Sequence, residues 1–138
     1  MINFYSENDF KLQNPKELLL WISNIIKAEG FEEGEISFIF CNDDYLHKLN
    51  VDFLNHDTLT DIISFDNSIG KQLHGDVYIS TERVRDNAKS YKTLFLDELH
   101  RVIIHGILHF CGFKDKLEED ITKMRDKEEQ ALSLRNFV

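Results

Sequence analysis

Apolar residues recur at helical spacing near the start of the chain. Between residues 15 and 28 they fall three or four positions apart, which predicts an amphipathic helix that ends before Gly30. The segment Asn14-Pro15-Lys16-Glu17 predicts an N-cap, a proline at the first helical position and an acid in the first turn. The residues expected to be buried are Leu18, Leu19, Ile22, Ile25 and Ile26.

Shorter stretches rich in β-branched and aromatic residues predict strands. They cover residues 2–5, 35–41, 60–65 and 75–80. Further helices are predicted at residues 42–53, 81–90, 94–111 and 117–134, with Asn42 and either Ser80 or Thr81 as caps. The last helix should present Ile121, Met124, Ala131 and Leu132 inward. This order predicts an α+β (α/β-like) fold, in which a single domain, 1–138, packs a mixed sheet of about four strands with about five helices.

The helix predicted at residues 94–111 carries apolar residues on every side, so it should be buried among other elements. His105 and His109 are four residues apart on it and therefore share one face. Gly112 follows as a helix-ending residue in left-handed conformation, and the reversal can bring Asp115 back towards the histidines. Two imidazoles and one carboxylate leave a coordination position open, as in catalytic zinc sites.

Two competing interpretations of this cluster remain open. A histidine pair at this spacing is often simply packed or solvated, and Asp115 could be a surface carboxylate paired with Lys114 and Lys116. His100 lies about 140° around the helix from His105, so it is not expected to be a ligand. The positions of His47, His56 and His74 do not follow from the sequence.

The composition is that of a globular protein outside the membrane. The chain has 138 residues, 42% hydrophobic and 30% charged, and no apolar run reaches the ~20 residues that cross a bilayer. The first residues lack the basic and apolar regions of a signal peptide. Cys41 and Cys111 form no C-x-x-C pair, which indicates a reduced, cytoplasmic protein.

The formal charge of -9 argues against broad, non-specific nucleic-acid binding. A local basic groove is still compatible with it. Arg85, Lys89 and Lys92 form one helical stripe, and Lys114 and Lys116 flank the third candidate ligand, so these side chains are candidate phosphate contacts. The alternative is an ordinary solvated helix face.

A divalent ion at the cluster would support hydrolysis. Zinc peptidases of the H-E-x-x-H type use the glutamate after the first histidine as general base, and this chain has Gly106 there. A glycine inside a helix costs about 1 kcal/mol relative to alanine. We therefore expect either another backbone or a substrate close to Gly106, or ordinary close packing.

Three segments together resemble the YbeY endoribonucleases of bacterial ribosomal RNA maturation, over most of the chain from about Leu49. The family's H-G-x-L-H-x-x-G-[YF] signature is similar to residues 105–113, its L-N…T-[DN]-[VI]-[LI]-S-F segment to Leu49-Asn50 with residues 60–65, and its G-D-[IV]-x-[IL]-S strand to residues 75–80. Asp115 takes the position of the family's third histidine, Leu54 that of an arginine implicated in RNA work, and Asp66 that of a proline.

The resemblance implies a compact α/β fold and a metal-dependent endoribonuclease directed at single-stranded RNA, with the small ribosomal subunit or its proteins as partners. It also implies trimming of the 3′ end of small-subunit (16S) rRNA, ribosome quality control and a zinc ion held by His105, His109 and Asp115. Asp115 should widen the choice towards manganese or another divalent ion. Arg85, Lys89 and Lys114 are the candidate substrate contacts. A minimal zinc metallopeptidase and a non-catalytic, metal-stabilised ribosome-assembly factor are the alternatives.

Overall fold

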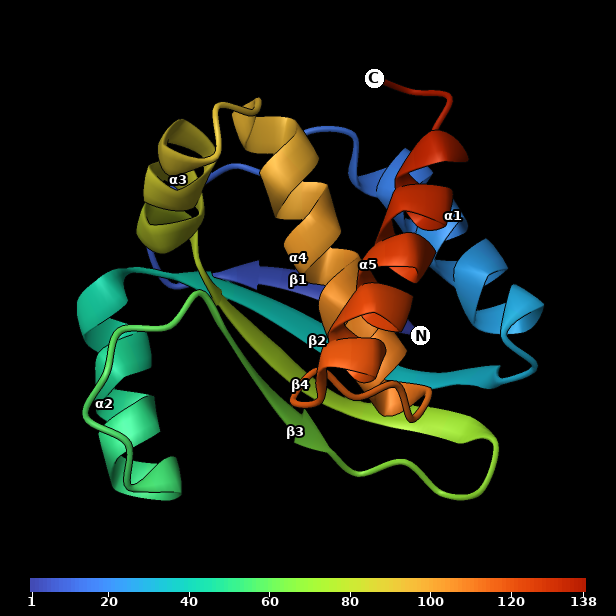
Figure 1. The fold of residues 1–138 in the computed structure, drawn as a ribbon, viewed down its shortest axis with the longest axis horizontal. Helices are drawn as coiled ribbons and strands as arrows, with labels where there is room; N and C mark the ends of the chain where they lie inside the picture. The colour runs from blue at the N-terminus through green and yellow to red at the C-terminus, as the bar shows by residue number, and fades with distance from the viewer.

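The secondary structure follows the predicted order of elements. The computed structural model describes residues 1–138, and Figure 1 shows the course of the chain. The elements are β1 (Ile2–Ser6), α1 (Pro15–Ala28), β2 (Glu32–Cys41), α2 (Asp43–Leu54), β3 (Ile62–Asp66), β4 (Gln72–Ser80), α3 (Thr81–Ser90), α4 (Phe95–Phe110) and α5 (Glu118–Ser133). The five helices and one mixed sheet confirm the predicted fold class.

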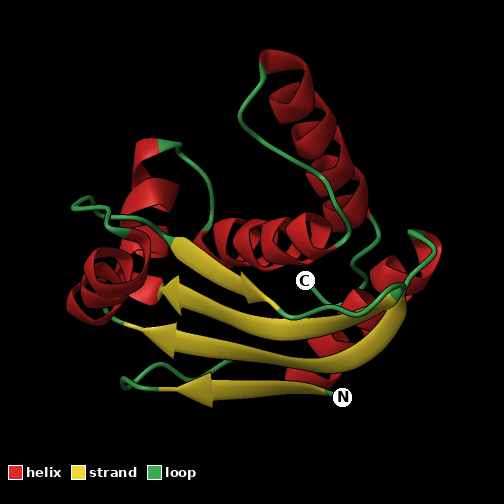
Figure 2. Ribbon diagram, turned by 90° about the horizontal axis from the view of Figure 1, so that it is seen from below, coloured by secondary structure: helices red, strands yellow, loops and turns green.

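The four strands are arranged in the order β1-β2-β4-β3. β1, β2 and β4 are parallel, and β3 pairs with β4 in the antiparallel sense, as the opposed arrow in Figure 2 shows. β2 and β4 each begin three residues earlier than predicted. The first residues of these strands are polar: Glu32 pairs with Gln72, and the register shifts between Glu33 and Ile36. Hydrophobic alternation therefore could not identify this part of the strands.

The two faces of the sheet are covered unequally. Alternate side chains of the central strand, including Ile36, Phe38 and Phe40, are fully buried in a core shared with α1, α3, α4 and α5. The opposite face packs a smaller cluster around Cys41, Leu46 and Ile63, in contact with α2 alone. In Figure 1, α4 crosses in front of the sheet with α5 beside it. This arrangement places the histidine-bearing helix between β3, β4 and α5.

The predicted helix caps are partly wrong. Ser80 caps α3 as expected, because its side-chain oxygen accepts a hydrogen bond from Arg83 N at 3.1 Å. Asn14 instead adopts a left-handed backbone with φ 55°, and its side chain makes no cap hydrogen bond. Asn42 accepts from Asn8 through its side-chain oxygen, and the free N–H of Asp43 donates to Glu82. At the start of α2 a tertiary partner, Glu82, therefore replaces the local cap, whereas at the start of α1 the left-handed backbone of Asn14 leaves its side chain out of a cap hydrogen bond.

The inward face of α5 also differs from the prediction. Met124 and Ala131 are buried and Leu132 is half-buried, but Ile121 is 50% exposed. Ile121 lies in the first turn of α5, where it borders a cavity rather than the core. No helix combines the length and apolarity needed to span a membrane.

Candidate metal centre

The helix end and the turn after it bring the three predicted ligands together. Gly112 has φ 95°, and Phe113 N donates to Leu108 O at 3.0 Å, which is the long hydrogen bond of a Schellman C-cap. This turn reverses the chain so that Asp115 returns to α4 beside His105 and His109. One nitrogen of each imidazole and one carboxylate oxygen lie within 4.8 Å of one another.

The distances between these three atoms are nearly equal. The Nε2 atoms of His105 and His109 are 2.9 Å apart, and each lies 3.2 Å from Asp115 Oδ2. Tetrahedral zinc with ligands at about 2.0 Å has ligand atoms about 3.3 Å apart. The spacing therefore fits a small tetrahedral ion.

The outer nitrogens of both histidines are already bonded. His109 Nδ1 lies 2.9 Å from the backbone oxygen of Phe113, which can only accept, so Nδ1 of His109 carries the proton. His105 Nδ1 lies 2.7 Å from Glu128 Oε2. When both Nδ1 atoms donate, both Nε2 lone pairs face each other and Asp115. Such a group of electron pairs is stabilised by a positive charge between them, from a shared proton or a metal ion, and the residues present fit a divalent metal ion.

Glu128 of α5 is a site residue that the sequence analysis missed. It is buried, and Arg101 Nη1 donates to its Oε1 at 3.0 Å while its Oε2 accepts from His105. Burial raises the pKa of Glu128, but the hydrogen bonds from His105 and Arg101 outweigh this effect and leave it lowered. The sequence did contain an indication of this role, because Glu128 lies between Met124 and Ala131 on the buried stripe of α5. A glutamate on such a stripe requires a partner.

The same contact acts on the histidine. Burial lowers the pKa of His105, but the hydrogen bond and charge of Glu128, with the charges of Asp115 and Asp61, raise it overall. The site is thus strongly anionic around its imidazoles. It would bind cations and repel a bare phosphate until a metal ion neutralises it.

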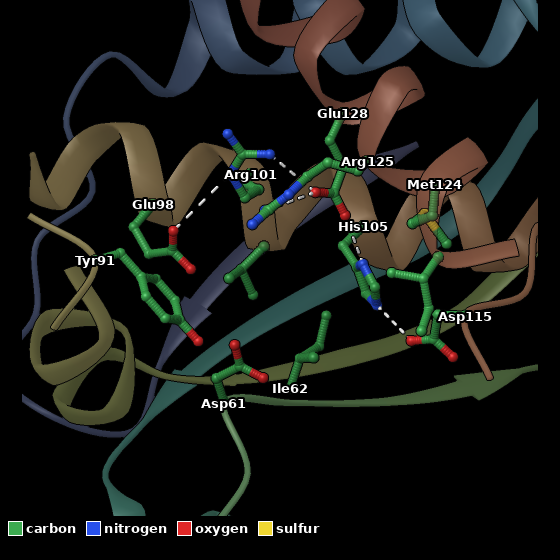
Figure 3. Close-up of a pocket in the computed structure, with 12 residues that line it drawn as sticks. Asp61, Ile62, Tyr91, Glu98, Arg101, His105, Asp115, Met124, Arg125 and Glu128 are labelled. Atoms are coloured by element: carbon green, nitrogen blue, oxygen red, sulfur yellow. Dashed lines mark hydrogen bonds and ion pairs between the residues drawn. The ribbon is translucent and has the colours of Figure 1, made fainter. Parts of the chain in front are cut away.

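Two cavities meet at the candidate ligands. One, of about 430 Å³, lies between α4, α5 and the start of β3, and Figure 3 shows its lining. The other, of about 720 Å³, lies on the side of α2 and includes Leu54, His56 and Lys116. His105, Asp115 and Asp61 line both. A chain passing from one cavity into the other would therefore cross the metal centre.

The first cavity contains carboxylates that the sequence analysis did not select. Glu98 of α4 is buried, and its nearest cation is Arg101 Nε at 3.9 Å. Asp61 precedes β3 and receives a long, 3.4 Å hydrogen bond from Asn87. Burial is the main cause that raises the pKa of both carboxyl groups. Perturbed carboxyl groups in a cleft beside a metal centre are typical of functional sites.

The three predicted substrate contacts lie outside these cavities. Arg85 places its guanidinium over the ring of Phe95 at 4.5 Å, and neither Lys89 nor Lys114 lines either cavity. Their role stays a prediction. The basic residues that do line the cavities are Arg101 and Arg125 in the first and Lys116 in the second.

The remaining histidines occupy separate positions. His100 is buried and accepts a hydrogen bond from Arg135, so it lies away from the cluster as expected. His47 pairs with Asp57, and His74 bonds Gln72 and the backbone of Glu35. Among these side chains only His56 lines a cavity next to the metal centre.

Gly106 is explained by packing. A Cβ atom at this position would lie 3.1 Å from both Ile62 Cδ1 and Val77 Cγ1. The close neighbours are therefore side chains of the sheet and not a backbone. A glutamate at position 106 would point into the sheet and not towards the ligands. The general base of the H-E-x-x-H zinc peptidases therefore has no equivalent at this position.

Comparisons with known proteins agree with the motifs. Residues 2–136 match the family model described as Endoribonuclease YbeY. The protein of that name from Christiangramia forsetii is 59% identical over 96% of this chain and 93% of its own length. The protein of the same name from Flavobacterium johnsoniae is 52% identical over 97% of this chain and 96% of its own length. A solution structure of a Thermotoga maritima protein matches with a TM-score of 0.69 and 26% identity, covering 96% of this chain and 87% of that one. The chain belongs to the YbeY endoribonuclease family.

Proposed function

We propose that this protein hydrolyses phosphodiester bonds in single-stranded RNA with one divalent ion, zinc, held by His105, His109 and Asp115. The observation that carries the proposal is the convergence of the Nε2 atoms of His105 and His109 with a carboxylate oxygen of Asp115, while both Nδ1 atoms already contact acceptors. The names of the related proteins support RNA as the substrate. A bound divalent ion would supply polarisation of a phosphoryl oxygen and activation of water.

The residues of the chain have separate tasks in this proposal. Glu128 and the carbonyl group of Phe113 orient the imidazoles, and the Gly112 turn positions Asp115. Lys116, in the second cavity, is the proposed phosphate contact on the side of α2. Leu54 lines the same cavity at the position of the family's arginine, so Lys116 would compensate for the missing positive charge there.

Zinc and manganese are distinguished by ligand chemistry. Two imidazoles and near-tetrahedral spacing favour zinc, while the carboxylate of Asp115 makes the site more tolerant of manganese than three histidines would be. We propose zinc as the resident ion for this reason.

The proposed cellular role is trimming of the 3′ end of small-subunit rRNA, with a part in ribosome quality control. It rests on membership of the family and needs its own test in cells. Cells lacking the protein should accumulate small-subunit rRNA with an extended 3′ end, and the wild-type gene should reverse this. A metal-ligand variant that also reverses it would support the non-catalytic assembly role instead.

The proposed activity is tested by metal analysis and RNA cleavage together. Purified protein should contain about one zinc ion per chain and cleave a single-stranded RNA oligonucleotide, whereas His109→Ala should lose both properties. His47→Ala is the matched control, because His47 pairs only with the exposed Asp57. Cleavage that persists in His109→Ala would reveal a contaminating nuclease, and intact RNA with the zinc-loaded wild type would contradict the proposal.

A further inference from the structure

The cavity on the α5 side of the candidate metal centre, here called the slot, combines apolar side chains with the carboxylates of Asp61 and Glu98. Its apolar lining comes from Ile62 of β3, Val102 of α4 and Ile121 and Met124 of α5, and Tyr91, which is 63% exposed, also lines it (Figure 3). About 430 Å³ is within the range of small-molecule sites. Such a slot is suited to a flat ring with polar groups along one edge.

Glu98 has an unused acceptor that faces this slot. Its side chain is 7% exposed, it makes no hydrogen bond, and the ion pair with Arg101 is long at 3.9 Å. In Figure 3 one carboxylate oxygen of Glu98 lies on the side of Arg101, where the dashed line marks the ion pair, and the other points towards Asp61 and Tyr91. The Glu98 oxygens are not fully buried, because the one fully buried side-chain atom without a hydrogen-bond partner is Arg83 Nε; they can therefore accept from a molecule in the cavity, and no donor lies closer to them than Arg101. A ligand with N–H groups would supply what is missing.

The charges of the slot select the kind of ligand. Asp61 and Glu98 would repel a phosphate group beside them, and Arg101 is already paired with Glu128 and Glu129, so a neutral ring with N–H donors is favoured next to Glu98 over the backbone of the RNA. A second metal ion is also disfavoured. The only group of three or more ligand atoms from His, Cys, Asp or Glu that lies close enough to hold an ion is the one already described.

The distance from the metal centre suits a neighbouring nucleotide. Glu98 and His105 are two helical turns apart on α4, about 10.5 Å along its axis. A nucleotide whose phosphate lies at the metal centre could thus extend its base along the slot to Glu98. Arg125 is 60% exposed and forms a 3.6 Å ion pair with Glu128 through Nη1, and its remaining donors could contact the adjoining phosphate.

The pattern of donors distinguishes the four bases. Guanine presents two neighbouring donors, N1–H and the N2 amino group, which one carboxylate accepts side by side. Adenine and cytosine place an acceptor nitrogen next to the amino group, and uracil flanks its N–H with two carbonyl oxygens. We infer that the slot between Tyr91 and Glu98 binds a guanine base next to the cleaved phosphodiester, and so gives the enzyme a preference for guanine.

This inference rests on the proposed function, but binding tests it without cleavage. The four nucleoside 5′-monophosphates are titrated into the zinc-loaded protein, and binding is followed by calorimetry. Guanosine monophosphate should bind at least about tenfold more tightly than the others, the discrimination expected of one bidentate contact. A zinc-loaded protein that binds all four equally would overturn the guanine site, whether or not it cleaves RNA.

Substitution at Glu98 separates recognition from structure. In Glu98→Gln the side chain presents one acceptor and one donor, a pattern that adenine and cytosine both match, so the preference for guanine should fall at least about tenfold and binding of adenine and cytosine should rise. Glu129→Gln is the control: Glu129 also bonds Arg101, but it is 59% exposed and lies outside the slot. Equal loss of guanine preference in both variants would overturn the assignment to Glu98.

Cleavage provides the second readout. On a random single-stranded RNA pool, cut ends should be enriched in guanine on one side of the break, and Glu98→Gln should reduce that enrichment while the zinc content is unchanged. RNA cleavage without guanine enrichment would overturn the guanine site and leave the proposed function intact. Guanosine binding without RNA cleavage would support the site and contradict the proposed function. If Glu98→Gln fails to fold, the relative affinities of the wild-type protein for the four nucleoside monophosphates still test the guanine site.

Discussion

His100 and His105 lie on the same helix, five residues apart, and the structure uses them in opposite ways. His100 Nδ1 lies 2.8 Å from Arg135 Nη1, a cation that can only donate, and its ring is packed between Trp21 and Phe137. His105 Nδ1 lies 2.7 Å from Glu128, an anion that accepts. The charge of the Nδ1 partner therefore sets which nitrogen keeps a lone pair and whether that lone pair faces a metal centre.

The contrast extends to proton affinity. Burial, assisted by the positive charge of Arg135, lowers the pKa of His100 to about 4, whereas the anions around His105 raise its pKa despite burial. One histidine is a neutral part of the core and the other belongs to an anionic pocket. Both are helical histidines among apolar neighbours in the sequence, so the partners from other elements make the difference.

The largest expected effect is the dependence of stability on pH at His100. Because its pKa falls from 6.5 to about 4 on folding, the folded state binds fewer protons, and stability present above pH 6.5 is lost as the pH falls towards 4. The full loss is about 3 kcal/mol. The groups facing His100 include Arg135, which is fixed in charge, and Asp97, which partly opposes the shift.

Urea unfolding at several pH values, with His100→Asn as the comparison, measures this effect. Asparagine keeps an acceptor for Arg135 but has no proton to gain, and the carboxylates common to both proteins cancel in the difference. The free energy of unfolding of the variant should therefore rise relative to that of the wild type as the pH falls from 7 to 4. A gap independent of pH would show that His100 does not behave as a buried neutral group.

The next effect concerns the partner of His105. In Glu128→Gln the amide can still contact His105 but no longer holds it as a strong acceptor, so zinc affinity should fall about 10- to 100-fold, as for other residues that orient a metal ligand. Competition with a zinc-binding dye measures the affinity directly. Glu129→Gln is the matched control because it touches Arg101 but not His105. Equal zinc affinities of the wild type, Glu128→Gln and Glu129→Gln would contradict the role assigned to Glu128.

Asp115→His tests the carboxylate and should have a smaller effect. A third imidazole restores the ligand set of the family and favours zinc over harder ions, so the ratio of zinc to manganese affinity should rise about tenfold. Parallel titrations with the two metals provide this ratio. A ratio that stays constant would mean that Asp115 does not contribute a ligand atom.

The sequence predicted the geometry of this helix well, because local rules decide it. The helical spacing of His105 and His109, the left-handed Gly112 and the returning Asp115 are all within eleven residues. Glu128 is 23 residues away, and its contact depends on how α5 packs against α4. The basic stripe at Arg85 and Lys89 shows the same limit, since helical spacing identifies a face but not the element or cavity that it meets.

The smallest effect is expected at Gly106, which lies next to His105 and nearly two turns after His100. Gly106→Ala gains up to about 1 kcal/mol of helix propensity, but the new Cβ would lie 3.1 Å from Ile62 Cδ1 and Val77 Cγ1, so these two side chains, or the α4 turn that carries His105, must shift by a few tenths of an ångström. The two contributions nearly cancel, so the free energy of unfolding should change by less than about 1 kcal/mol. Zinc affinity should still fall measurably, since the displaced turn carries His105, whereas the environment of Trp21 beside His100 should stay the same. Denaturant unfolding, zinc titration and tryptophan fluorescence measure these three effects separately. A change in fluorescence alone would show that the substitution disturbs α4 near His100 and not near His105, and would contradict this prediction.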